Sequence, residues 1–216
     1  MFSINMASLL ILGLIMQIGG TYLVNAAVVY FASDSGAMGF FPKAAQQYMG
    51  FMTAVNGYTP SQMVQAMFVF PLVEELVFRL IFLRAGKMIM PFWAANIVQA
   101  TLFAFYHSLT LQRMYAFVLG LMIGCVFHYC PIIYRRAYSQ EEDNGKKKAA
   151  GLLDMPDSLI GVMLTFILHV TINSTGLFIS PRLPADVTLP VQVVVGTIFL
   201  ALSALACLRL GRKGRS

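Results

Sequence analysis

The hydrophobic residues of this chain fall into long runs, separated by short stretches that are polar, glycine-rich or interrupted by proline. A helix needs about 20 mostly apolar residues to cross the hydrocarbon core of a bilayer. Six runs meet or approach this length, and they cover residues 5–31, 61–85, 91–109, 113–134, 155–176 and 190–210. The pattern therefore predicts an all-α, polytopic transmembrane bundle of about six spanning helices, folded as one domain over residues 1–216.

Prolines mark the predicted edges of these helices. Pro60, Pro91, Pro156 and Pro190 each stand at or near the beginning of a run, where a proline is tolerated because the first N–H groups of a helix have no partner within it. Pro131 stands near the end of the fourth run, where we expect it to stop the helix.

Two stretches between the runs are too polar or too interrupted to span. Residues 33–58 contain several glycines and aromatic residues, which predicts an extracytoplasmic or interfacial connection with a re-entrant or interfacial helix. Residues 135–150 contain Glu141, Glu142 and Asp143, followed by a run of three lysines. This segment is predicted to be a charged, solvated cytoplasmic loop.

Composition supports a membrane location. The chain is 58% hydrophobic and only 11% charged, whereas soluble domains have about 25% charged residues. Its net charge of +6 is too small and too scattered for a nucleic-acid-binding face. With six spans, eleven Lys and Arg residues fall on one side and three on the other, which predicts that both termini are cytoplasmic. The apolar N-terminus predicts a retained first span, and the small size favours a prokaryotic plasma membrane.

Several polar residues in the runs have ordinary structural interpretations. Gln17, Asn25, Asn96 and Gln99 are predicted to form hydrogen bonds between helices, and His128 stands near a cytoplasmic helix end where it can reach water. The three cysteines lie in apolar stretches without the spacing of a disulfide or metal site, which predicts packing residues: Cys125, Cys130 and Cys207.

The second run contains three ionisable residues in an otherwise apolar helix: Glu74, Glu75 and Arg79. Each such residue costs about 2.5–3.5 kcal/mol at the centre of a membrane helix, so each needs a reason. Glu75 and Arg79 are four positions apart, share a helix face and are predicted to pair. Glu74 points elsewhere on an α-helix, which predicts one structural carboxylate and one available for chemistry.

Three more polar residues are predicted at a similar depth. His107 lies on the third run, and His169 and Asn173 lie four positions apart on the fifth. At about 1.5 Å per residue, these helices bring Glu74 and both histidines about 18–24 Å from the cytoplasmic ends. Separately, each could be a hydrogen-bonding or ion-pair contact between helices. As a set they suit general-base chemistry on water, with donors for the developing negative charge.

These residues form three short motifs, E-E-x-x-x-R, F-x-x-x-H and H-x-x-x-N, in this order and on separate predicted helices. Their residues are Glu74, Glu75 and Arg79, then Phe103 and His107, then His169 and Asn173. The set resembles the CAAX protease and bacteriocin-processing family, the Abi-type intramembrane proteases that include the eukaryotic Ras-converting CAAX endopeptidases. The resemblance extends from the second run to the fifth, about half of the chain.

The resemblance implies a helical intramembrane endopeptidase. In that family pattern, Glu74 and His107 activate the attacking water, and His169 with Asn173 binds the tetrahedral oxyanion. The substrate would be a membrane-anchored or hydrophobic peptide or protein, processed in a CAAX-like, leader-peptide or C-terminal sorting reaction.

Glu75, Arg79 and Phe103 would then be supporting residues that maintain the shape of the site. The family has been described both as glutamic-type and as metal-dependent, and we expect no cofactor, because Glu74 and His107 can activate water directly. If the enzyme is metal-dependent, the expected ion is Zn²⁺, and its ligands would be Glu74, His107 and His169.

Two other classes of protein remain open on the sequence. The first is a non-catalytic membrane scaffold or immunity protein with the same fold. The second is a proton-coupled transporter, because intramembrane acids and histidines also form proton relays. The absence of an inverted internal repeat counts against a transporter.

Overall fold

The computed structural model describes residues 6–32, 42–143, 155–184 and 187–215, and the ordered elements in these ranges are all helical. The all-α prediction is therefore confirmed. The longer helices are α1 (Met6–Ala32), α2 (Pro42–Asn56), α6 (Phe92–Tyr106), α7 (Thr110–Asp143), α8 (Asp157–Phe178) and α9 (Leu189–Arg215), and a short 3₁₀ turn, η3 (Ser180–Arg182), follows α8.

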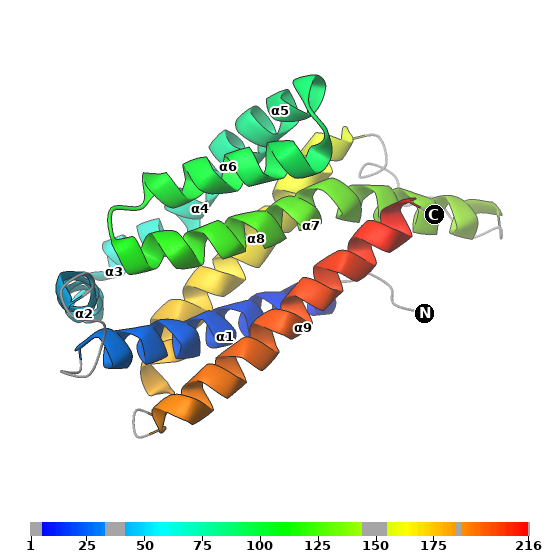
Figure 1. Ribbon diagram of the computed structural model, residues 1–216. Coiled ribbons are helices and arrows are strands. Elements are labelled where there is room, and N and C mark those ends of the chain that lie inside the picture. The colour runs from blue at the N-terminus through cyan, green and yellow to red at the C-terminus, as the bar shows by residue number, and fades with distance from the viewer. Residues whose placement is uncertain (1–5, 33–41, 144–154, 185–186, 216) are drawn as a thin grey trace.

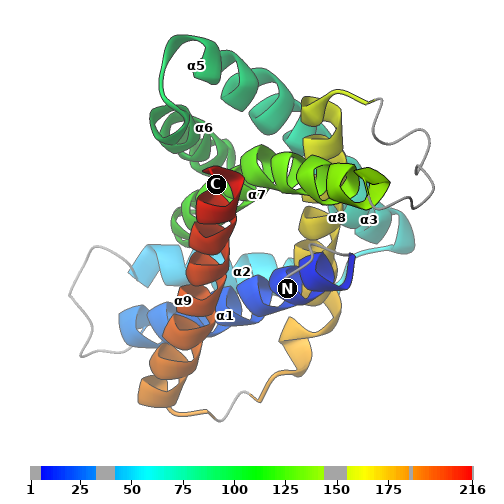
Figure 2. The ribbon, with the colours of Figure 1, turned by 90° about the vertical axis from the view of Figure 1, so that its right-hand side faces the viewer.

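The long helices pack side by side as a bundle (Figures 1 and 2). α1 packs against both α8 and α9, while α7 packs against α6, α8 and α9. Four helices of the described chain, α1, α7, α8 and α9, are long and apolar enough to cross a membrane. α6 is apolar but shorter. The chain therefore has at least four candidate spans, and the full count of about six stays a prediction.

The predicted span 61–85 lies in a helical run over residues 60–89 that changes its winding four times. It consists of α3 (Pro60–Val64), the π-helical turn η1 (Gln65–Val69), α4 (Phe70–Glu74), the π-helical segment η2 (Glu75–Leu83) and α5 (Arg84–Ile89). The run begins with a capping box between Thr59 and Gln62. In π-helical turns the N–H groups bond five residues back, and such turns occur frequently at functional sites.

α7 differs from its prediction at the C-terminal end. Pro131 lies inside the helix, and the first part of the predicted loop 135–150 is helical to Asp143. Pro131 has no N–H for the carbonyl of Phe127, four residues back. Gly161 of α8 lies against this carbonyl, since a Cβ at Gly161 would be 2.8 Å from Phe127 O. The close approach of α8 covers the freed carbonyl, and the helix continues past the proline. Residues 144–150 lie outside the described chain.

A helix also occupies part of the predicted connection 33–58. α2 crosses the end of the bundle, because the view in Figure 1 looks along α2 while α1 and α7 run across the page. This orientation agrees with an interfacial helix, although its depth in a membrane stays a prediction. Residues 33–41 lie outside the described chain.

The predicted interhelical hydrogen bonds are confirmed between α6 and α7. Gln99 Nε2 donates to Asn96 Oδ1 (2.8 Å) and to the Gly120 carbonyl (2.9 Å), and Asn96 Nδ2 donates to the Leu121 carbonyl (3.0 Å). Gly120 and Gly124 of α7 allow α6 to pack closely against α7, since a Cβ at Gly124 would be 1.9 Å from Asn96 Oδ1. This contact fixes α6, and with it the end of α6 that precedes His107.

Elsewhere in the bundle the prediction is also confirmed for Gln17, whereas Asn25 of α1 is exposed. Gln17 of α1 accepts a hydrogen bond from the Tyr115 hydroxyl of α7 and so joins these two helices. The three cysteines are free and buried, as expected of packing residues.

Candidate active site

The predicted ion pair between Glu75 and Arg79 is present. Arg79 Nε lies 3.3 Å from Glu75 Oε2, and both side chains are completely buried. The guanidinium also lies over the Phe103 ring, with Cζ 4.6 Å from the ring centroid. Neither Glu75 Oε2 nor any guanidinium nitrogen of Arg79 has a well-aligned hydrogen-bond partner. The pair is therefore held by charge and by the aromatic ring rather than by saturated hydrogen bonding.

His169 contacts both adjacent carboxylates. Its Nδ1 lies 2.8 Å from Glu75 Oε1, and its Nε2 lies 3.4 Å from Glu74 Oε2. Glu74 and His169 are buried, at 8% and 4% exposure. Glu74 and Glu75 therefore share one partner, which the prediction of one structural and one available carboxylate did not include. Both residues keep α-helical dihedral angles (φ −64°, ψ −42° and φ −65°, ψ −39°), and each ring nitrogen of His169 faces one of the carboxylates.

The protonation of His169 follows from its two partners. A neutral imidazole has a single N–H donor, whereas ionised carboxylates only accept. The two contacts are therefore both satisfied when His169 is an imidazolium, or when the Glu74 carboxyl carries the shared proton. Both arrangements leave the cluster without net charge, because Arg79 compensates the Glu75 carboxylate in each of them.

His107 follows α6 directly and is held on three sides. Its backbone is extended (φ −80°, ψ 139°), and its N–H donates to the Ala104 carbonyl (3.1 Å). Arg113 Nε donates to the His107 carbonyl (2.7 Å), and the ring Nδ1 lies 2.9 Å from the Phe103 carbonyl. A carbonyl only accepts, so Nδ1 carries the hydrogen of the neutral ring and Nε2 keeps a lone pair. This is the tautomer of a general base.

Phe103 links His107 to the buried cluster. Its ring centroid lies 4.9 Å from the His107 ring and 6.0 Å from the His169 ring, edge-on in both cases. The same ring contacts the Arg79 guanidinium. Phe103 therefore contacts both histidine rings and the Arg79 guanidinium, and its supporting role stays a prediction.

Asn173 has a partner that the sequence reasoning missed. Its Nδ2 donates to the Ala66 carbonyl (2.8 Å) in the π-helical turn η1. That carbonyl has no donor in its own helix, because the Phe70 N–H bonds Gln65 and the next residue is Pro71, which has no N–H. In the sequence, Pro71 was the residue that could have indicated a backbone carbonyl without a donor. This contact uses one of the two amide hydrogens of Asn173 and leaves the other for a ligand.

The residues named for a possible zinc site are not arranged as a ligand set. Among the residues that the structure describes, no three His, Cys, Asp or Glu side chains form a group that could hold a metal ion. His169 directs both ring nitrogens at carboxylates, and His107 directs Nδ1 at a backbone carbonyl. Glu74, His107 and His169 would have to rearrange before they could bind a metal together.

Comparison with known protein families supports the resemblance found in the sequence. The family described as type II CAAX prenyl endopeptidase Rce1-like matches residues 56–135. The matched segment runs from the end of α2 into α7 and includes both glutamates, Phe103 and His107, whereas His169 and Asn173 lie beyond it. No curated protein and no solved structure matches the chain. The resemblance to CAAX-type proteases is thus confirmed for this segment.

Proposed function

We propose that this chain, whose residues 56–135 match the Rce1-like CAAX endopeptidases, is an intramembrane endopeptidase that hydrolyses a peptide bond in a membrane-associated protein or peptide. The observation that carries the proposal is the contact of His107 Nδ1 with the Phe103 carbonyl (2.9 Å), which leaves Nε2 as the lone-pair nitrogen of the neutral ring. Six spans, cytoplasmic termini and a prokaryotic plasma membrane complete the proposal.

In the proposed reaction His107 is the general base. A water between His107 Nε2 and Glu74 loses a proton to Nε2, while the Glu74 carboxylate accepts a hydrogen bond from it and fixes its direction. The resulting hydroxide oxygen attacks the carbonyl carbon of the scissile bond. The π-electron pair of that carbonyl moves to its oxygen, which becomes the oxyanion.

His169 and Asn173 are the proposed donors to this oxyanion. The contact between His169 Nε2 and Glu74 is long at 3.4 Å, so a stronger acceptor such as an oxyanion can compete for it. The free amide hydrogen of Asn173 supplies the second donor, which is the arrangement of an oxyanion hole. When the intermediate collapses, the C–N bond breaks and the leaving nitrogen takes the proton from His107.

Glu75 and Arg79 are proposed to position His169 rather than to touch the substrate. Glu75 bonds the opposite ring nitrogen of His169 (2.8 Å), which orients the ring and stabilises its charged form. Arg79 in turn compensates the Glu75 carboxylate. The reaction needs no metal in this scheme, so activity is expected to survive dialysis against a zinc chelator. Loss of activity with the chelator, and recovery with Zn²⁺, would contradict it.

The test compares Glu74→Gln and His107→Gln with the wild type. Each variant keeps the side-chain size close to the original but removes the acceptor or base. General acid–base catalysis contributes about 10²–10⁴-fold to a rate, so each is expected to lose cleavage by that factor. The measurement is mass spectrometry of protein termini in membranes of cells that make the wild type or a variant, which detects cleavage of any membrane protein without choosing a substrate beforehand.

Matched control variants come from outside the site. Asp157→Asn neutralises a carboxylate that pairs with Arg135, and His128→Gln removes a histidine that contacts Lys87 (2.8 Å) and stacks on Phe92. Both should give the wild-type pattern of termini. Identical termini in the wild type and Glu74→Gln, with equal protein levels, would contradict the proposal and favour a non-catalytic membrane protein.

A further inference from the structure

The residues of the candidate site differ in how far they are exposed. Glu75 and Arg79 are fully buried, and Glu74 and His169 are nearly so. His107 and Asn173 are only partly buried. The partly buried side chains are the ones that a substrate can reach first, and their level in the membrane indicates the direction of its approach.

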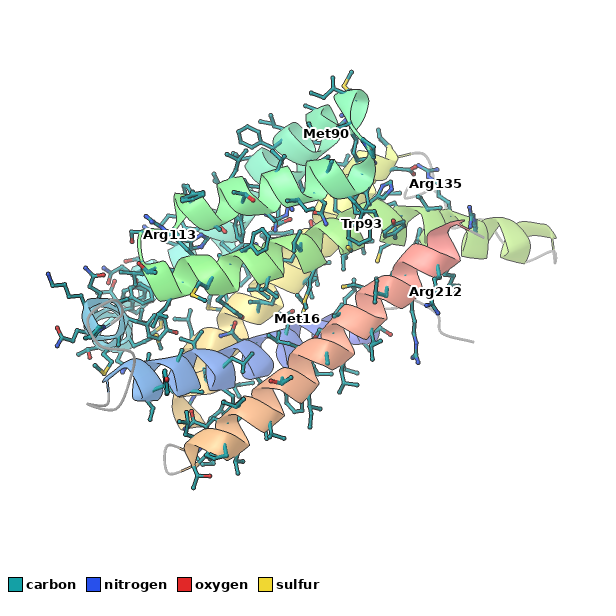
Figure 3. The ribbon with its side chains drawn as sticks, in the orientation of Figure 1. Met16, Met90, Trp93, Arg113, Arg135 and Arg212 are labelled. Carbon is teal, nitrogen blue, oxygen red and sulfur yellow. The ribbon has the colours of Figure 1, made fainter. Side chains whose placement is uncertain are left out.

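The depth of His107 in the membrane can be estimated along helix α7. Arg113 lies in the first turn of this helix, and Arg135 lies eight residues before its last residue, Asp143 (Figure 3). At about 1.5 Å per residue they are about 33 Å apart, close to the roughly 30 Å thickness of the hydrocarbon core. The two arginines therefore bracket the hydrocarbon, each at one membrane–water interface.

His107 lies at the Arg113 level, because Arg113 Nε donates to its carbonyl at 2.7 Å. Helix α8 places the site residues in the same order of depth, measured from the opposite membrane interface. Asp157, near the start of α8, marks that interface because it pairs with Arg135. From Asp157, His169 is about 18 Å along the helix and Asn173 about 24 Å. The buried residues thus lie near the middle of the membrane, and the accessible ones lie towards the Arg113 interface.

The distribution of basic residues assigns the two interfaces. In the described chain, the end of the bundle with Arg135 and Arg212 (Figure 3) carries eight basic residues, and the end with Arg113 carries three. The former are Arg84, Lys87, Arg135, Arg136, Arg209, Arg212, Lys213 and Arg215, and the latter are Lys43, Arg113 and Arg182. By the positive-inside rule the Arg113 end, and His107 with it, faces the extracytoplasmic side.

We infer that substrates enter this site from the extracytoplasmic face and are cut at the outer membrane–water interface, which makes them membrane-anchored polypeptides whose cleavage site has been translocated. The inference rests on the proposed protease function and narrows it. A protein that is anchored by a lipid on the cytoplasmic surface presents its cleavage site about 30 Å away, across the full hydrocarbon core.

Thiol accessibility tests the position of the entrance. The native cysteines are buried, so single cysteines can be added to the wild type at Ser108, exposed beside His107, and at Arg212, exposed at the other end. A membrane-impermeant maleimide added to intact spheroplasts should label Ser108→Cys, and should label Arg212→Cys only after the membrane is permeabilised. The opposite pattern would overturn the inference. Thr110→Cys, also exposed, serves if Ser108→Cys does not accumulate.

The position of the cut sites tests the substrate class. The termini that depend on Glu74 should map to extracytoplasmic segments within a few residues of a membrane anchor. A bulky impermeant maleimide on Ser108→Cys should also abolish their formation in intact spheroplasts, because it blocks the entrance. Glu74-dependent termini on cytoplasmic segments would overturn this inference but keep the protease. No Glu74-dependent termini at all would instead contradict the proposed function, while the labelling still reports the membrane face.

Discussion

Two buried polar clusters lie in this bundle, and they differ in charge. The amide cluster, Asn96 and Gln99, joins α6 to α7 through neutral hydrogen bonds to each other and to backbone carbonyls. The charged cluster, Glu74, Glu75, Arg79 and His169, joins residues 60–89 to α8. Both are deep in an apolar molecule, but only the second contains groups that can exchange protons.

The two clusters also differ in how completely their hydrogen bonds are used. In the amide cluster one buried atom, Gln99 Oε1, has no partner in the described structure, whereas Glu75 and Arg79 leave four such atoms. Neutral side chains that only hold membrane helices together need no free hydrogen-bonding atoms. Unsatisfied charged groups are costly and persist where a function uses them. Bond saturation therefore distinguishes the neutral cluster from the charged one, whose unsatisfied atoms belong to the supporting pair of Glu75 and Arg79.

The largest effect is expected from breaking the charged cluster. Arg79→Met removes the cation and leaves Glu75 buried, which should destabilise the fold by about 3–5 kcal/mol. Glu75→Gln in the same chain should restore much of this stability, because no uncompensated charge then remains at that pair. Thermal and denaturant unfolding in detergent measure both. An Arg79→Met protein as stable as the wild type would show that Arg79 does not compensate Glu75.

A smaller effect is expected from the amide cluster. Gln99→Leu leaves the Gly120 carbonyl and Asn96 Oδ1 without their donor, which should cost about 1–3 kcal/mol of unfolding free energy. Cleavage per folded molecule should nevertheless equal that of the wild type, since the amide does not touch the site. If the folded Gln99→Leu protein loses cleavage as Glu74→Gln does, the division into structural and catalytic clusters is wrong.

The smallest effect is expected at Phe103, which borders the charged cluster. Phe103→Leu keeps an apolar side chain but removes the ring over Arg79, a contact worth about 0.5–2 kcal/mol. Phe78, which packs edge-on against Phe103 at 5.1 Å, offers a matched Phe78→Leu control without the cation. The loss of stability should be larger at Phe103. Equal losses at both positions would mean that packing alone, and no attraction to Arg79, explains the contact.

Much of the site could be predicted from the sequence because its residues are costly in an apolar chain. Glu75 and Arg79 pair as their four-residue spacing indicates, and Asn96 and Gln99 form the expected interhelical bonds. The first error concerned Glu74, which shares His169 with Glu75 because the imidazole, from the distant helix α8, faces one carboxylate with each ring nitrogen.

Proline was the second source of error. Pro131 was expected to end α7, but the approach of Gly161 covers the carbonyl that the proline frees. The partner of Asn173 was missed because it is a backbone carbonyl freed near Pro71. In both cases a residue distant in sequence compensates a local defect, so no local pattern could reveal the outcome.

The amino-acid sequence alone establishes that this protein is a helical membrane protein and which polar residues need an explanation, because hydrophobic length and the cost of buried charge are local properties. How those residues pair is a property of the folded bundle. The contact that sets the tautomer of His107 is local, four residues back at the Phe103 carbonyl, but the shared contacts of His169 depend on helices brought together from distant parts of the chain. Such contacts follow from packing, and packing is not encoded in any single segment.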